Sequence, residues 1–140
     1  MAPLPNRNTR TMRSEARRSL VAVVDDEPII RIAIGSLLQT AGYDAVLFAS
    51  GSDFLESLTV QHPDCLLLDY SMPGLSGLDV ISSLVTTGKL DIPIIIVTGS
   101  SDARLESRSL NAGARKVLRK PVSDVQLFAA VESALVERNG

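Results

Sequence analysis

The stretch that decides the fold is CLLLDYSMPGLSGLDVISSLV, residues 65–85 of this 140-residue chain. It opens with four apolar residues, continues through Asp69 and the turn dipeptide Pro73-Gly74, and ends with apolar residues at helical spacing. A short apolar run with no polar alternation is typical of a parallel strand that is covered on both faces. The stretch therefore predicts a buried strand, a turn and a helix.

The same unit recurs along the chain on both sides of this stretch. Strands are expected at residues 20–24, 44–48, 94–97 and 115–118, and helical spacing is expected to begin at Pro28, Ser50, Asp102 and Ser123. Strict alternation of strands and helices favours a parallel sheet with helices on both faces. The predicted fold class is therefore α/β, with a doubly wound five-stranded parallel sheet.

Composition narrows the class of protein further. The formal net charge of −2 does not suggest a nucleic-acid-binding protein, and the apolar runs are too short to cross a bilayer. A single cysteine, Cys65, excludes an intrachain disulfide and fits a reducing compartment. We therefore expect a soluble, cytoplasmic protein that does not bind nucleic acid or membrane directly.

The first 18 residues differ from the rest in charge. They hold five arginines and a single acid, Glu15, and almost no large apolar residue. Such a segment cannot offset the entropy lost on ordering, so residues 1–18 are predicted to be a disordered basic tail and residues 19–140 the folded domain. A basic, acid-poor start also resembles an organelle transit peptide in composition.

Polar residues stand just after the predicted strands. Asp25 and Asp26 follow the first, Asp69 ends the third, Thr98 ends the fourth and Lys120 follows the fifth. In a doubly wound sheet these side chains should converge on one pocket at the carboxyl ends of the strands. Crowded carboxylates repel one another, and a hard divalent cation such as Mg²⁺ would resolve the conflict. With an ammonium and a hydroxyl nearby, the set suits phosphoryl transfer to a carboxylate.

Four motifs resemble the receiver domain of two-component response regulators, over about Leu20–Val136. They are VVDDEP (23–28), LLLDYSMPGLSGLDV (66–80), IIIVTGS (94–100) and NAGARKVLRKP (111–121). The resemblance implies a flavodoxin-like (βα)5 fold with strand order 2-1-3-4-5. It also implies a protein that takes a phosphoryl group from a sensor histidine kinase or a phosphotransfer protein and signals through changed protein contacts, and that is not a conventional enzyme.

The resemblance further implies a role for each site residue. Asp69 would be the phospho-acceptor, and Mg²⁺ would bind Asp26, Asp69 and the backbone carbonyl of Ser71, with Asp25 acting through water. Lys120 would pair with the phosphoryl group, and Thr98 would turn its hydroxyl toward it after transfer. The peptide between Lys120 and Pro121 is expected to be cis, as in many relatives.

One position departs from the family pattern. The third residue before the lysine, usually Tyr or Phe in the family, is Val117 here. A β-branched aliphatic side chain cannot report the switch by rotating a ring. The phosphorylation chemistry is expected to survive, whereas the usual relay from Thr98 to an aromatic residue is not expected.

A basic surface is expected beside the site. Between Arg104 and Arg119 the chain has five basic residues and one acid, Glu106; the basic residues are Arg104, Arg108, Arg115, Lys116 and Arg119. In relatives the fourth helix, fifth strand and fifth helix form the output or dimer face. These residues are therefore a candidate docking surface for an acidic protein partner or a second copy of the chain, and solvated surface charge is the alternative.

Three other hypotheses remain open at this point. The chain could be a receiver-like scaffold that works without phosphate, or the receiver part of a longer DNA-binding regulator. It could also be a Mg²⁺-dependent phosphohydrolase, although such enzymes typically carry a second acid where this chain has Ser71. The chain ends directly after the last predicted helix, so we expect output by protein contact.

Overall fold

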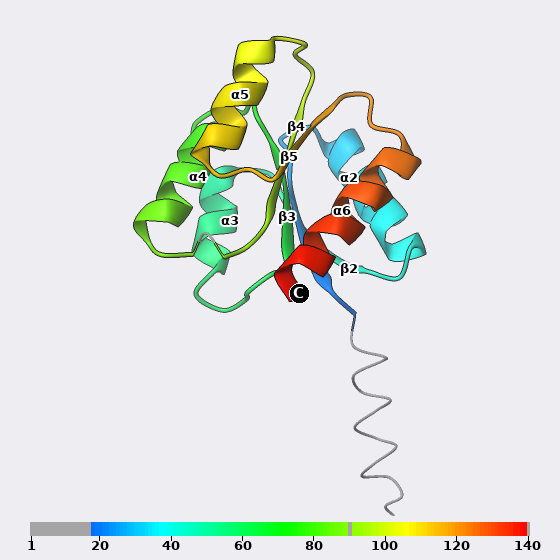
Figure 1. Ribbon diagram of the computed structural model, residues 1–140. Coiled ribbons are helices and arrows are strands. Elements are labelled where there is room, and N and C mark those ends of the chain that lie inside the picture. Colours follow the sequence, from blue (N-terminus) through cyan, green and yellow to red (C-terminus); the bar gives the residue numbers. More distant parts are fainter. Residues whose placement is uncertain (1–17, 90, 140) are drawn as a thin grey trace, which may run out of the picture.

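The computed structural model describes residues 18–89 and 91–139 (Figure 1). The basic tail predicted at residues 1–18 therefore lies outside the described residues, apart from Arg18.

Within the described residues, five strands form one sheet and five helices cover it (Figure 1). The strands are β1 (Leu20–Val24), β2 (Asp44–Phe48), β3 (Cys65–Asp69), β4 (Ile94–Thr98) and β5 (Lys116–Arg119). The helices are α2 (Pro28–Thr40), α3 (Gly51–Ser57), α4 (Gly77–Thr86), α5 (Ala103–Ala112) and α6 (Asp124–Asn139).

The sheet has the order β2-β1-β3-β4-β5, and all its strand pairs are parallel. This confirms the predicted doubly wound fold and its strand order. The predicted bounds of β1 and β2 match the structure, and β5 begins one residue later than the predicted 115–118. β5, the strand with the weakest apolar pattern, was thus predicted least accurately.

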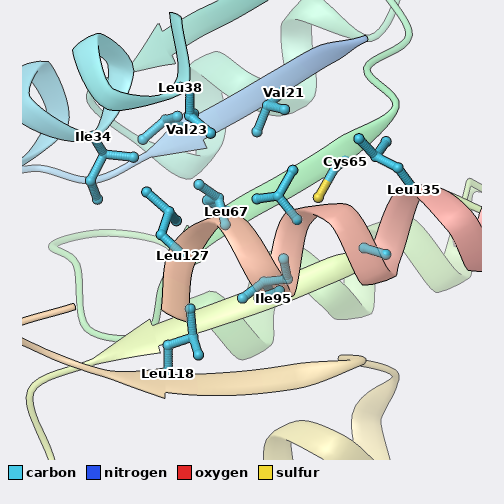
Figure 2. Close-up of a cluster of buried hydrophobic side chains, with 13 residues drawn as sticks. Val21, Val23, Ile34, Leu38, Cys65, Leu67, Ile95, Leu118, Leu127 and Leu135 are labelled. Carbon is cyan, nitrogen blue, oxygen red and sulfur yellow. The ribbon is translucent and has the colours of Figure 1, made fainter. Parts of the chain in front are cut away.

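Two hydrophobic clusters fill the two faces of the sheet. Helices α2 and α6 enclose one cluster, in which Leu38 and Leu127 lie against Val23, Leu67 and Ile95 (Figure 2). Helices α3, α4 and α5 cover the other face, as Figure 1 shows. Every residue of β3 is buried, which explains why its first four residues are apolar without alternation.

Local sequence also sets where the helices begin. Pro28 stands at the first position of α2, where its missing N–H costs no hydrogen bond. Ser50 accepts a hydrogen bond from the backbone of Asp53, and Ser76 and Asp79 form a reciprocal capping box at the start of α4. These caps place each helix start directly after a strand or its loop, at the carboxyl end of the sheet.

Candidate functional site

The carboxyl ends of β1, β3, β4 and β5 open into one pocket. Its volume is about 420 Å³, and it is lined by Glu27, Asp69, Ser71, Thr98, Gly99, Ser100 and Lys120. The lining residues come from loops that are far apart in the sequence, because a parallel sheet brings the ends of its strands to one edge.

Three carboxylates lie together at this pocket. Asp25, Asp26 and Asp69 each offer an oxygen, and these oxygens all lie within 4.8 Å of one another. Asp25 is 2% exposed and Asp69 5% exposed, whereas Asp26 is half-buried. Hard oxygen donors at this spacing are the ligands that Mg²⁺ prefers, so the residues present fit that ion.

Lys120 is the positive charge of the site. Its Nζ atom lies 3.1 Å from Oδ2 of Asp25 and 3.4 Å from Oδ2 of Asp69. It also lies 3.4 Å from Oε1 of Glu27, a residue that the sequence analysis did not assign to the site. One ammonium is therefore shared among three carboxylates, two of which are buried.

The protonation of this cluster follows from burial and charge. Burial, together with the charge of Asp25, raises the pKa of Asp69 from 3.8 to about 6, although Lys120 and a backbone hydrogen bond from Ser71 act in the opposite direction. Burial alone would lower the pKa of Lys120, but its hydrogen bond to Asp25 and the charges of Asp69 and Asp25 outweigh burial and raise it. The site thus favours a charged lysine, and it makes ionisation of Asp69 costly while no cation is bound.

Asp25 is held through both its carboxylate and its backbone carbonyl. Its Oδ1 accepts a hydrogen bond of 2.9 Å from the backbone N–H of Glu27, and its Oδ2 contacts Lys120. Its backbone carbonyl accepts a 2.7 Å hydrogen bond from the guanidinium of Arg31, on the second turn of α2. These contacts fix the loop between β1 and α2 and the direction of the Asp25 carboxylate.

The loop after Asp69 is fixed by a close backbone approach. The N–H of Gly77 donates a 2.8 Å hydrogen bond to the carbonyl of Tyr70. A Cβ atom at Gly77 would lie 2.9 Å from the carbonyl oxygen of Asp69 and 3.0 Å from Cα of Tyr70. Only glycine fits there without a backbone shift, so Gly77 sets where the acceptor loop runs.

Thr98 and Val117 occupy different places around the site. Thr98 is 3% exposed, and its Oγ1 accepts a 3.0 Å hydrogen bond from the backbone N–H of Ser100. Val117 pairs with Ile96 on β4 and packs half-buried against the cluster under α4. Lys120 follows β5, and its peptide bond to Pro121 is cis, as predicted.

The structure thus brings together Asp25, Asp26, Asp69, Thr98 and Lys120, with Ser71 on the same pocket wall. Val117 is not part of the pocket lining. The sequence reasoning missed Glu27, although it stands directly after the two aspartates of the VVDDEP motif. Glu27 and Lys120 are 93 residues apart in the chain, and no local pattern around Glu27 indicates a contact between them.

The basic surface is exposed but partly neutralised. Arg104 contacts Asp102 on its own helix start, Arg115 contacts Glu137 of α6, and Arg119 contacts Glu106. The acids Asp102 and Glu137 lie outside the sequence window in which this surface was counted. Arg108 and Lys116 are exposed and carry the remaining charge of the expected face.

Comparison with known proteins agrees with this geometry. Residues 21–132 match the family model described as response regulator receiver domain. Among curated proteins, Nodulation protein W of Bradyrhizobium diazoefficiens is 36% identical over 117 residues, which cover 84% of this chain and 51% of that protein. Transcriptional regulatory protein FixJ of the same organism is 33% identical, with 82% and 56% covered. The chain spans about half the length of the curated relatives it matches.

Solved structures show the same fold. A response regulator receiver domain protein from Clostridium thermocellum superposes with a TM-score of 0.80 at 28% identity, covering 86% of this chain and 97% of that one. A CheY-like receiver domain protein from Methanospirillum hungatei gives a TM-score of 0.81 at 24% identity, covering 88% of this chain and 98% of that one.

In the described part of the chain, no helix is long and apolar enough to cross a membrane.

Proposed function

Since this chain belongs to the response regulator receiver family, we propose that Asp69 accepts a phosphoryl group from a sensor histidine kinase or a phosphotransfer protein. Receiver domains are generally signalling proteins rather than conventional enzymes, and they bind Mg²⁺ at an acidic pocket. The phosphorylated chain then signals through altered contacts with other proteins.

The proposed step transfers phosphorus between two atoms. A carboxylate oxygen of Asp69 attacks the phosphorus of the donor phosphohistidine, and a new P–O bond forms while the P–N bond breaks. The electron pair of the broken bond stays on the imidazole nitrogen. Asp69 must be ionised to attack, and its raised pKa means that the neighbouring positive charges have to support that state.

The other site residues neutralise and orient the transferred group. Asp26, Asp69 and the backbone carbonyl of Ser71 would hold Mg²⁺, with Asp25 acting through water, and the ion would supply positive charge to the phosphoryl oxygens. Lys120 would pair with the phosphoryl group. Thr98 accepts its present hydrogen bond and keeps its own hydroxyl proton, which it can donate to a phosphoryl oxygen after transfer.

One observation carries this proposal: the buried carboxylate of Asp69 lies beside two other aspartates and within 3.4 Å of Lys120. This arrangement supports the proposal because it brings a buried carboxylate oxygen, a set of oxygen ligands that fits a divalent cation, and an ammonium together. Positioning and charge neutralisation are what phosphoryl transfer mainly requires.

The test uses acetyl phosphate and Mg²⁺ with intact-mass measurement. Wild type should gain the mass of one phosphoryl group, and Asp69→Asn should gain nothing. Asp44→Asn is the matched control, because Asp44 is an exposed aspartate at the opposite end of the sheet. A wild-type chain without mass gain, or a gain that persists in Asp69→Asn, would favour the phosphorylation-independent scaffold instead.

We place the docking of the phosphodonor protein on the ends of α2 and α6 nearest the pocket. Ile29 and Ile32 on α2 are 83% and 56% exposed, and Val125 near the start of α6 is 76% exposed. Both helices cover the same face of the sheet, and both begin at the edge where Asp69 ends β3 (Figure 1). Exposed apolar side chains on helices that begin at this edge of the sheet suit the apolar part of a protein interface.

Ile29→Asp tests this placement. Transfer from a phosphorylated histidine phosphotransfer protein should slow, whereas phosphorylation by acetyl phosphate should stay unchanged because that small donor needs no docking. Val60→Asp serves as the control, since Val60 is 88% exposed and follows α3, away from the pocket. Equal slowing with both donors would argue against a docking role.

For the output we propose the surface of α5, β5 and α6, on which Arg108 and Lys116 are exposed basic residues. The partner is an acidic protein or a second copy of this chain. Reversing the charge of Arg104 and Arg108 should weaken that contact, measured as self-association of the phosphorylated chain by sedimentation or as binding to a captured partner. Unchanged binding and self-association would remove this surface from the proposal.

A further inference from the structure

The carboxylate of Glu27 is directed away from its expected role. Glu27 stands at the N-cap position of α2, where a side chain usually accepts a hydrogen bond from the helix, but its side chain makes no such bond. Instead its Oε1 lies 3.4 Å from Nζ of Lys120. The helix start is formed without it, because Pro28 occupies the first helical position.

The backbone of Glu27 also contacts the cluster around Lys120. Its N–H donates to Oδ1 of Asp25, and Asp25 in turn contacts Lys120 through Oδ2. The backbone and the carboxylate of Glu27 therefore both serve the same cluster. Glu27 also lines the pocket together with Asp69, and its side chain is 59% exposed.

We propose that Glu27 is a specificity-determining residue that competes with an incoming phosphoryl group for Lys120 and repels highly charged small phosphodonors. This inference rests on the proposed function of Asp69. When a phosphoryl group enters, Lys120 must exchange the oxygen of Glu27 for a phosphoryl oxygen. Glu27 also slows phosphorylation in a second way, because its negative charge at the mouth of the pocket repels a dianionic donor.

The charge of Glu27 affects a protein donor and a small donor differently. A docked protein presents its phosphohistidine through the binding energy of a whole interface, which can outweigh one exposed carboxylate. Acetyl phosphate has no such interface and meets the full repulsion. Glu27 therefore biases the site against phosphorylation by metabolic acyl phosphates, in favour of a protein donor.

The direct test compares Glu27→Gln with wild type at saturating Mg²⁺. In the reaction with acetyl phosphate, the oxygen of Asp69 forms a bond to phosphorus, and acetate leaves with the electron pair of the broken P–O bond. The rate constant should rise about two- to fivefold, the size expected for losing one exposed ion pair. Glu56→Gln is the matched control, because it removes the same charge from an exposed position on α3.

Two readouts separate competition from a structural effect. The gain should be smaller with phosphoramidate, a monoanion near neutral pH, than with the dianion acetyl phosphate. Binding of beryllofluoride, measured by titration followed by NMR, should also tighten in Glu27→Gln, without any turnover. An equal gain with both donors, or unchanged beryllofluoride affinity, would overturn the proposal.

Glu27→Asp tests the contact with Lys120 itself. It keeps the negative charge but shortens the side chain by one methylene group, so part of the gain should appear. A wild-type rate in Glu27→Asp overturns the competition for Lys120. If wild type itself gains no phosphoryl group, the function proposed for Asp69 fails; if wild type is phosphorylated and Glu27→Gln behaves like Glu56→Gln, only the role of Glu27 fails.

Discussion

Nζ of Lys120 lies 3.4 Å from Oδ2 of Asp69, although Asp69 ends β3, Lys120 follows β5, and β4 lies between these two strands in the sheet. The contact crosses the carboxyl edge of the sheet, and a second contact of 3.1 Å links the same ammonium to Asp25 at the end of β1. Lys120 thus joins the ends of three strands.

Asp69 is expected to destabilise the metal-free fold at neutral pH. Its pKa is raised to about 6 in the folded chain from 3.8, so the folded state binds the proton more tightly than the unfolded state. Stability should therefore fall as pH rises from about 4 through about 6 and level off above. Asp69→Asn should stabilise the chain by about 1 to 3 kcal/mol at pH 7.5 in EDTA, measured by urea unfolding.

The same variant at pH 4.5 provides the internal comparison. The wild-type carboxyl is then largely protonated in the folded state, so the advantage of Asp69→Asn should shrink. A gain of equal size at both pH values would show that the stabilisation comes from packing and not from charge.

Magnesium should stabilise the chain by binding at the cluster of Asp25, Asp26 and Asp69. At ten times its dissociation constant, a ligand that binds only the folded state adds about 1.4 kcal/mol, which raises the melting temperature of a domain of this size by about 4 °C. The shift should be larger at pH 7.5 than at pH 5, because protonation of Asp69 removes a ligand. Asp26→Asn should abolish most of it, and Asp44→Asn should retain it; differential scanning calorimetry measures both.

Gly77→Ala should disturb the acceptor loop. The added Cβ would lie 2.9 Å from the backbone oxygen of Asp69, and a backbone atom cannot move aside as a side chain can. We expect a loss of about 1 to 3 kcal/mol in unfolding free energy and slower phosphorylation of Asp69.

Gly35→Ala is the control for this variant. Its Cβ would also meet a neighbour at 2.9 Å, but that neighbour is the end of the Leu47 side chain, which can rotate. Stability should change little, since alanine also has the higher helix propensity. Equal losses in the two variants would contradict the special role of the Gly77 backbone approach.

Val117→Ala should separate stability from chemistry. Val117 packs half-buried against the cluster under α4 and pairs with Ile96, not with Thr98. Truncation should cost about 1 kcal/mol of unfolding free energy and leave the rate of phosphorylation by acetyl phosphate within about twofold of wild type. A large fall in that rate would reveal a coupling between Val117 and the pocket that the packing does not indicate.

Much of this fold could be predicted because its signals act over short distances in the chain. The continuous apolar runs of β3 and β4 identify strands covered on both faces, and every residue of both strands is buried. Pro28 and Ser50 mark helix starts through effects within one turn, whereas the cap at Ser76 was found only in the structure. Where the pattern was weaker, at β5, the predicted bounds were off by one residue.

The sequence predicted which strand-end residues lie together at the candidate site, but not which of their side chains are in contact. The rule that parallel strands end at one edge places Asp25, Asp69, Thr98 and Lys120 together before any coordinates are known. It does not say which of these side chains touch. The third carboxylate on Lys120, from Glu27, could not be foreseen, because an acid at a helix start has a sufficient local explanation.

The charge of the basic surface likewise depends partly on the sequence and partly on tertiary contacts. Counting residues between Arg104 and Arg119 gives a strongly basic segment, yet Glu137 of α6 comes from outside that window and contacts Arg115. Periodicity, capping and strand-end position depend on residues close in the chain, so the sequence alone determined the fold and brought Asp69, Thr98 and Lys120 to one pocket. Which carboxylates share Lys120, and which acids pair with Arg115 and Arg119, depends on side chains that meet only after the sheet has assembled, so the tertiary structure alone decided it.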